Sequence, residues 1–156
     1  MFLYELFPPE LIKIDLESED KDEAFEEMVD IFCRARKNSF RKDILEAIYE
    51  RESKMSTGIF KGIAIPHGKS NVLDRIHGVL GISKKGIDYD SLDNQPVYII
   101  FLLLAPIRES EKHLLFLKKL SSLVSNPHFY SELLDQKNPK DVQNLIRKYE
   151  DILISE

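Results

Sequence analysis

Histidine is the side chain of this protein best suited to nucleophilic chemistry near neutral pH, and one of the four histidines lies in a distinctive setting. His67 follows Pro66 and precedes Gly68, and the apolar residues 63–65 lead into this group. The apolar triplet predicts a short buried strand. Pro66 has no amide hydrogen for a sheet ladder, so we expect the strand to stop at His67, beside a glycine that permits unusual backbone angles. Reactive groups of α/β folds often lie at strand ends, which makes His67 a candidate catalytic residue.

Phosphoryl transfer is the chemistry that the residues around His67 favour. A neutral imidazole carries a lone pair on one nitrogen and is a nucleophile near neutral pH. The reaction otherwise needs positioning and electrostatic stabilisation, which hydroxyl groups and backbone amides supply. Ser56 and Thr57 precede the strand, and Gly68 follows the histidine. We therefore predict that Ser56, Thr57 and Gly68 bind the phosphate oxygens.

His113 and Arg51 are two further candidates, for which the spacing leaves a structural alternative open. Ser110 is expected to cap a helix that begins at Glu111, which places His113 in the first turn. A helix N-terminus disfavours a second positive charge and attracts anions, so His113 should stay neutral beside a phosphoryl group; the alternative is an ordinary exposed residue. Arg51 ends another predicted helix, where its guanidinium either clamps a phosphate or offsets the helix dipole.

The remaining histidines and the single cysteine carry no comparable signal. We expect His77, in a strand, and His128, in a short helix, to be structural, and we expect Cys33 to pack on a helix face. The histidines and the cysteine lack the short paired spacings of zinc ligands. The sequence also has no Gly-x-x-x-x-Gly-Lys loop and no Gly-x-Ser-x-Gly elbow, which disfavours nucleotide hydrolysis and serine hydrolysis.

The composition is typical of a soluble protein, which we expect to form a single domain over residues 1–156. The net charge of −5 argues against binding to nucleic acid or to an anionic membrane. A single cysteine cannot form an internal disulfide, which favours a reducing compartment. The sequence shows no signal-peptide pattern, and its longest apolar run, 97–106, is shorter than the ~20 residues that cross a bilayer. These features predict a cytoplasmic location.

Apolar periodicity and turn signals predict a mixed β-sheet flanked by helices, in the α/β or α+β class. The run 97–104 shows no polar alternation, so we expect a central strand that is covered on both faces. The other expected elements are an edge strand within 11–16, helices at 20–36 (capped by Asp20) and 39–52 (capped by Ser39), the strand before Pro66, a hairpin over 76–89 that turns at 84–86, and three helices capped by Ser110, Asn126 and Asn138.

Several of these motifs also resemble a known family. Arg51-Glu52, Ser56-Thr57-Gly58 and residues 62–69 (Gly-Ile-Ala-Ile-Pro-His-Gly-Lys) are similar to the signature of the enzyme IIA (EIIA) domains of the fructose/mannitol type. These type-2 EIIA domains belong to the bacterial phosphoenolpyruvate-dependent phosphotransferase system (PTS). Residues 93–97, the apolar strand after them and His113-Leu114 resemble the same family. The resemblance covers nearly the whole chain, and it implies a mixed α/β sheet flanked by helices.

The resemblance implies a role for each candidate residue. In the family, the histidine matching His67 accepts a phosphoryl group on Nε2 from the phosphocarrier protein HPr or a paralogue. The histidine matching His113 supports the phosphorylated form, and the arginine matching Arg51 lines the same site. The resemblance therefore implies a phosphotransferase component that carries phosphohistidine and requires no nucleotide, cofactor or metal.

Within the family, the chain looks most like the nitrogen-regulatory enzyme IIA, in which the phosphorylation state tunes partner proteins. The alternative is a transport-type EIIA, which passes the phosphoryl group to a cysteine on an EIIB. A binding module that has lost phosphoryl chemistry is a third possibility, from another class. Phe60-Lys61 replaces residues that are often smaller or more polar in the family, and we expect this difference to alter the rim of the site.

Overall fold

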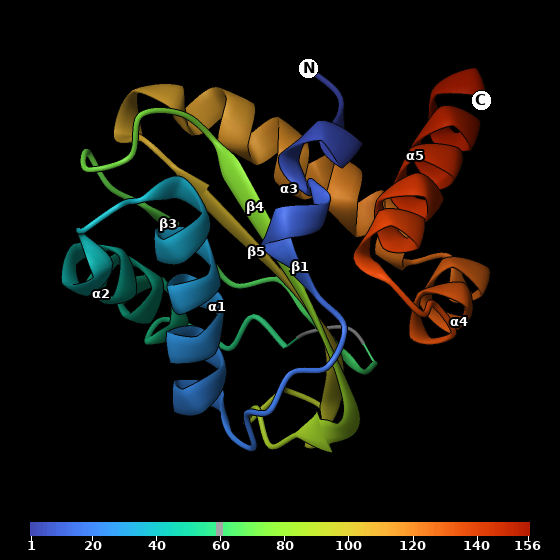
Figure 1. Ribbon diagram of the computed structural model, residues 1–156, viewed down its shortest axis with the longest axis horizontal. Coiled ribbons are helices and arrows are strands. Elements are labelled where there is room, and N and C mark those ends of the chain that lie inside the picture. Colours follow the sequence, from blue (N-terminus) through green and yellow to red (C-terminus); the bar gives the residue numbers. More distant parts are fainter. Residues whose placement is uncertain (59–60) are drawn as a thin grey trace.

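The computed structural model describes residues 1–58 and 61–156, and it shows a β-sheet with helices packed on both sides (Figure 1). The predicted difference at Phe60 lies outside the described residues. Short 3-10 helices at Leu3–Leu6, Pro9–Leu11 and Ile107–Glu109 accompany the main elements. In chain order these are β1 (Ile12–Lys13), α1 (Lys21–Arg36), α2 (Arg41–Glu52), β2 (Ile63–Ala64), β3 (His67–Lys69), β4 (His77–Ile87), β5 (Val97–Ala105), α3 (Ser110–Val124), α4 (Pro127–Leu134) and α5 (Pro139–Ser155).

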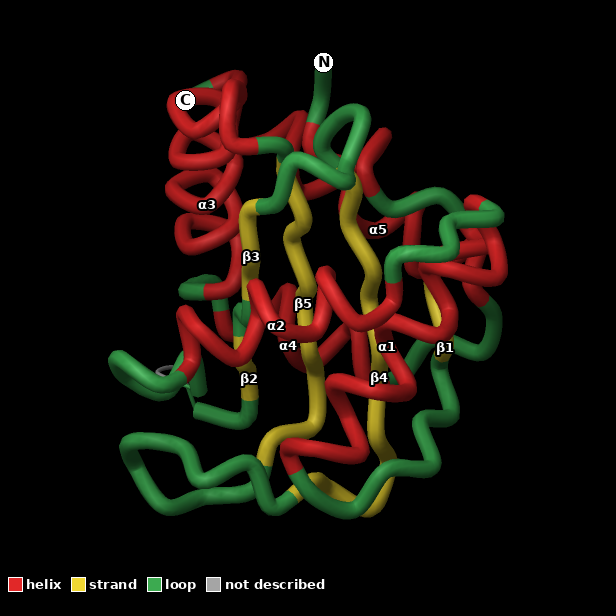
Figure 2. The backbone as a smooth tube through the Cα atoms, turned by 90° about the vertical axis from the view of Figure 1, so that its left-hand side faces the viewer, coloured by secondary structure: helices red, strands yellow, loops and turns green. Residues whose placement is uncertain are grey.

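β5 is the central strand that its unbroken apolar run predicts (Figure 2). It pairs antiparallel with β4 and parallel with β2 and β3, while β1 pairs in parallel with the other edge of β4. Alternate side chains of β5 enter two cores: Phe101 and Leu103 pack with α3, α4 and α5, whereas Leu102 and Leu104 pack with α1 and α2. Both faces of the strand are therefore buried, and the predicted mixed sheet flanked by helices is confirmed.

The predicted hairpin is wrong, because β4 is a single long strand. β5 is its antiparallel partner on both sides of the expected turn, with Ile82 opposite Ile99 and Ile87 opposite Val97. More residues of β4 than of β5 lie between these two pairs, so the extra residues form a bulge. Gly86 adopts a φ of 89° there, an angle that favours glycine. Turn-like residues at a bulge look the same in a sequence as the turn of a hairpin.

The chain continues to pair with β5 beyond Pro66, whereas the sequence predicts that the strand stops there. β3 begins at His67, which lies opposite Leu103 of β5. Pro66 cannot donate to the sheet, but its carbonyl accepts the Leu103 amide at 3.0 Å and holds the chain against β5. His67 is therefore the first residue of a strand and is not released from the sheet.

Most of the predicted helix starts are confirmed. Asp20 caps α1, and the two predicted asparagines cap α4 and α5, each with a proline at the first helical position. The predicted Ser39 cap is wrong: Phe40 occupies the N-cap position of α2 without a capping side chain, and Asn38 accepts the Phe40 amide at 2.8 Å. Within the described ranges, no helix is both long enough and apolar enough to cross a membrane.

A buried carboxylate joins both ends of the chain to α3. Glu150 of α5 is fully buried and accepts the Leu3 amide at 2.6 Å and the Tyr4 amide at 3.0 Å. Lys119 of α3 lies 3.0 Å from the same carboxylate. Since a buried charge is costly unless it is paired and hydrogen-bonded, these three donors are needed to keep Glu150 inside the fold.

We predict that Glu150→Ala lowers the free energy of unfolding by about 3 kcal/mol, because it leaves Lys119, the buried Leu3 amide and the half-buried Tyr4 amide without their acceptor. Urea denaturation followed by circular dichroism measures this loss. The control is Asp151→Ala, at the next and exposed position of α5, which should change the free energy by less than about 0.5 kcal/mol. Equal effects of the two substitutions would contradict the role assigned to Glu150.

Candidate active site

Four of the predicted site residues meet at one cavity of about 720 Å³: Arg51, His67, Gly68 and His113. Arg51 comes from the last turn of α2, His67 and Gly68 open β3, and His113 lies in α3. Gly68 has no positive φ, so unusual backbone angles are not its reason for being glycine. A Cβ atom there would lie 3.1 Å from backbone atoms of α2, so glycine lets β3 pack closely against that helix.

His67 is half-buried and is oriented by a backbone hydrogen bond. Its Nδ1 lies 3.1 Å from the Ile65 carbonyl oxygen. A carbonyl only accepts, so this contact assigns the proton to Nδ1 and leaves the lone pair on Nε2. The structure therefore presents Nε2 as the nucleophilic atom of the ring.

His113 lies beside His67 and is more deeply buried than the sequence suggested. The two ring centroids are 5.4 Å apart, with an interplanar angle of 71°. Only 2% of the surface of His113 is exposed, and neither ring nitrogen has a hydrogen-bond partner within residues 1–58 and 61–156. The predicted cap is wrong, because α3 begins at Ser110 itself, whose hydroxyl donates to the Ile107 carbonyl at 2.7 Å. A buried imidazole without a hydrogen-bond partner is unusual and calls for an explanation, of which a catalytic role is one.

Both imidazoles are held in the neutral form. Burial is the main cause that lowers the pKa of His113 to about 4, and repulsion from the protonated form of His67 and from Lys69 adds to it. Burial also lowers the pKa of His67, while the hydrogen bond to the Ile65 carbonyl acts in the opposite direction. The neutrality predicted for His113 from its helix position is therefore supported by burial.

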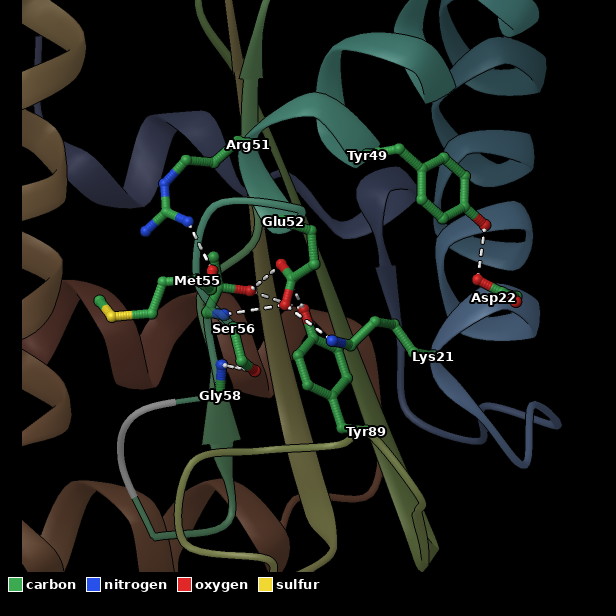
Figure 3. Close-up of polar contacts among 10 residues, drawn as sticks. Lys21, Asp22, Tyr49, Arg51, Glu52, Met55, Ser56, Gly58 and Tyr89 are labelled. Carbon is green, nitrogen blue, oxygen red and sulfur yellow. Dashed lines mark hydrogen bonds and ion pairs between the residues drawn. The ribbon is translucent and has the colours of Figure 1, made fainter.

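Arg51 and Lys69 place positive charge at the cavity. The Arg51 guanidinium donates from Nη1 to the Met55 carbonyl at 2.7 Å, which ties it to the loop after α2 (Figure 3). Lys69 also lines the cavity, and its Nζ lies 3.3 Å from the hydroxyl of Ser110, the first residue of α3. An anion in the cavity would thus meet two cations and two neutral histidines.

Ser56 and Thr57 are not brought to this cavity. The Ser56 hydroxyl accepts the Gly58 amide at 3.1 Å. Thr57 is buried, and its hydroxyl lies 2.6 Å from Glu52 and 2.7 Å from Tyr89. Sequence reasoning gave no role to Tyr89 or to Glu52, which it noted only as part of the family signature, because nothing local distinguishes a buried glutamate at a helix end from an exposed one.

The other histidines and the cysteine have surroundings that fit structural roles. His77 is buried, with Nε2 3.0 Å from Asp74 and its ring edge against Phe32. Burial raises the pKa of the Cys33 thiol, as expected of a packing residue. In the part of the chain that the structure describes, no group of three or more His, Cys, Asp or Glu residues is arranged to hold a metal ion.

Burial of neutral His113 predicts an acid-sensitive stability. The folded-state pKa of about 4 lies below the unfolded value of 6.5, so the folded protein binds fewer protons, and stability falls as the pH drops through this window. The loss between pH 7 and pH 4 should be about 2–3 kcal/mol for this residue. Urea denaturation across that range should show that His113→Gln has a correspondingly shallower acid dependence than the wild type. Parallel pH profiles would contradict the depressed pKa.

Comparison with known proteins shows the family to which the chain is similar. Residues 5–149 match the family model described as "Phosphoenolpyruvate-dependent sugar phosphotransferase system, EIIA 2". The chain is 35% identical over 150 residues to the PTS system fructose-specific EIIABC component of Bacillus subtilis, which covers 96% of this chain but only 24% of that protein. It is 31% identical to the PTS system fructose-specific EIIA component of Haloferax volcanii, covering 89% of this chain and 90% of that protein.

The fold has a close counterpart among solved structures. The crystal structure of nitrogen regulatory protein IIA-Ntr from Neisseria meningitidis superimposes with a TM-score of 0.86 at 29% sequence identity. The match covers 92% of this chain and 98% of that one. Because the family model spans nearly the whole chain, this protein belongs to the EIIA 2 family of the phosphoenolpyruvate-dependent sugar phosphotransferase system, whose members are phosphotransferase components.

Proposed function

We propose that this chain is a phosphoryl carrier that accepts a phosphoryl group on Nε2 of His67 from phospho-HPr or a paralogue. The observation that carries the proposal is the pair of neutral histidines at the cavity. His67 keeps its proton on Nδ1, toward the Ile65 carbonyl, and His113 is buried with both ring nitrogens unpaired in the described part of the chain. An unpaired buried donor costs about 1–3 kcal/mol, and a phosphoryl oxygen beside His67 is an acceptor for it.

In the proposed step, the Nε2 lone pair attacks phosphorus, the bond from phosphorus to the donor protein breaks, and the donor atom keeps the electron pair. The His67 ring gains positive charge, which the Ile65 carbonyl stabilises through the retained Nδ1 proton. His113 donates an N–H to a phosphoryl oxygen, and Arg51 and Lys69 offset the negative charge. Transfer onward to an acceptor is the reverse of the same displacement.

Gly68 borders the bound phosphoryl group in this proposal, since it lines the cavity next to His67. The binding of phosphate by Ser56 and Thr57 stays a prediction that the cavity does not support, because neither residue lines it. Their contacts point to a role in holding the loop after α2.

We further propose a regulatory role in the cytoplasm, in which the phosphorylation state of His67 changes the binding of a partner protein. The match to the nitrogen regulatory protein structure, which covers 92% of this chain and 98% of that one, supports this role. The alternative is transfer to an EIIB cysteine, supported by the two fructose-specific relatives, one of which is named an EIIABC component. A third alternative, a binding module without phosphoryl chemistry, requires equal partner affinity for the wild type and His67→Ala.

The regulatory and transport roles predict different fates for the phosphoryl group on His67. The ³²P-phosphorylated chain is mixed with a purified fructose-type EIIB, and label on the EIIB cysteine is followed over time. Rapid and complete transfer would favour the transport role and contradict the regulatory one. Retention of the label, together with partner binding that changes on phosphorylation of His67, would support regulation.

We predict that His67→Ala abolishes phosphate uptake, because it removes the only nucleophilic nitrogen that this step uses. The protein is incubated with phosphoenolpyruvate, enzyme I and HPr, and its intact mass is measured under conditions that preserve phosphohistidine. His128→Ala, which removes an exposed histidine of α4, should take up phosphate as the wild type does. Uptake by His67→Ala at the wild-type level would refute the proposal.

We predict that His113→Ala lowers kcat/KM with phospho-HPr by about 10²-fold, the usual effect of removing one donor to a developing charge. The variant should remain folded, because the missing ring has no hydrogen bond to lose among the residues described. Rapid-quench kinetics measures the rate, and circular dichroism checks the fold. Lys118→Ala, at an exposed position of the same helix, is the control. Wild-type kinetics in His113→Ala would remove His113 from the site.

A further inference from the structure

A buried carboxylate lies next to the cavity, on a residue that the proposed step does not use. Glu52 is the last residue of α2, and only 5% of its side chain is exposed. Its two oxygens accept both donors of Thr57: the hydroxyl at 2.6 Å and the backbone amide at 2.9 Å. Figure 3 shows Lys21 and Tyr89 reaching the same carboxylate from other parts of the chain.

Two further groups complete this cluster. Lys21 Nζ, from the start of α1, lies 3.0 Å from Glu52 Oε2 and forms an ion pair with it. The Tyr89 hydroxyl lies 2.7 Å from that of Thr57 and 3.5 Å from Glu52 Oε1. Because the Thr57 hydroxyl donates to Glu52, the Tyr89 hydroxyl donates to Thr57. Burial and the charge of Glu52 raise the pKa of Tyr89, which keeps it a donor.

Thr57 is in turn bonded to the strand segment that orients His67. Its carbonyl accepts the Ile65 amide at 3.1 Å. The carbonyl of the same Ile65 accepts the Nδ1 proton of His67, also at 3.1 Å. A continuous path of hydrogen-bonded groups therefore leads from the Glu52 carboxylate to the imidazole.

The stability of the fold does not by itself explain why a charged carboxylate, that of Glu52, is buried beside Thr57 and Tyr89. Apolar residues of similar volume often replace a buried ion pair without loss of stability, so the stability of the fold does not by itself require a carboxylate here. The negative charge of Glu52 raises the pKa of His67, whereas the charge of Arg51 lowers it. Glu52 thus favours the positive charge that the ring gains when a bond forms at Nε2.

We propose that Glu52, Thr57 and Tyr89 form a positioning network for His67. The network fixes the Ile65 carbonyl, so that the ring keeps its proton on Nδ1 and its lone pair on Nε2. None of the three lines the cavity, so they act through His67 and not on the phosphoryl group. The kinetic consequence rests on the proposed function, whereas the tautomer of His67 can be measured without any phosphoryl donor.

The test combines ¹⁵N NMR of the His67 ring with transfer kinetics in the full chain. The wild type should show a single tautomer with the proton on Nδ1. Glu52→Gln and Thr57→Val should populate the Nε2–H tautomer and lower kcat by roughly 10-fold or more, with KM for phospho-HPr unchanged, because the nucleophile is misplaced while the docking surface is intact. Thr57→Ser keeps the hydroxyl, so it should retain the wild-type tautomer and rate.

Matched controls separate positioning from general destabilisation. Glu46→Gln makes the same charge change at an exposed position of α2, and Tyr49→Phe removes a hydroxyl that is bonded to Asp22, outside the network. Both should keep the wild-type tautomer and rate. If Glu52→Gln does not fold, Tyr89→Phe, which removes only the outermost donor, should shift the tautomer in the same direction by a smaller amount.

Two results would overturn the inference: a folded network variant with the wild-type tautomer, or a rate loss in such a variant without any change of tautomer. Failure of the wild type to take up phosphate is a different outcome. It would reject the proposed function, while the NMR measurement would still decide whether the network sets the tautomer of His67.

Discussion

The pairing of β3 with β5 beyond Pro66 is the constraint on which the site depends. A proline cannot donate to a sheet, yet the Pro66 carbonyl accepts the Leu103 amide, and the chain resumes as a strand at His67. The imidazole is thereby fixed to the central strand, which is buried on both faces. The same strand segment carries Gly68 against α2, so the helix that ends in Arg51 and the strand that starts with His67 pack closely together.

The sequence predicts those features that a short stretch of chain encodes. The apolar run 97–104 identifies the central strand, and the Pro-His-Gly setting makes His67 the candidate among the four histidines, at the cavity where the structure places it. The bulge in β4 was mistaken for a hairpin, because both contain turn-like residues and only the partner strand distinguishes them. The burial of the Glu52 carboxylate could not be predicted either, because it depends on Lys21 and Tyr89, which are distant in the sequence.

The charged groups of the site are side chains other than the two histidines. Burial favours the neutral forms of His67 and His113, and the hydrogen bond from Nδ1 to Ile65 leaves the lone pair of His67 on Nε2. The permanent charges are held by Arg51 and Lys69 at the cavity and by Glu52 behind the loop. In the proposed step, an uncharged imidazole among fixed charges needs little rearrangement when an anionic group arrives, which is how preorganised sites lower barriers.

The acceptor for the His67 proton is a backbone carbonyl, and this choice affects how the site tolerates mutation. Every residue type has a carbonyl oxygen, so substitution of Ile65 changes the packing but cannot delete the acceptor itself. A side-chain acceptor would be lost by a single substitution. Most substitutions of Ile65 therefore leave the orientation of the His67 ring unchanged. The orientation is more sensitive to residues farther away, which hold the Ile65 backbone in place.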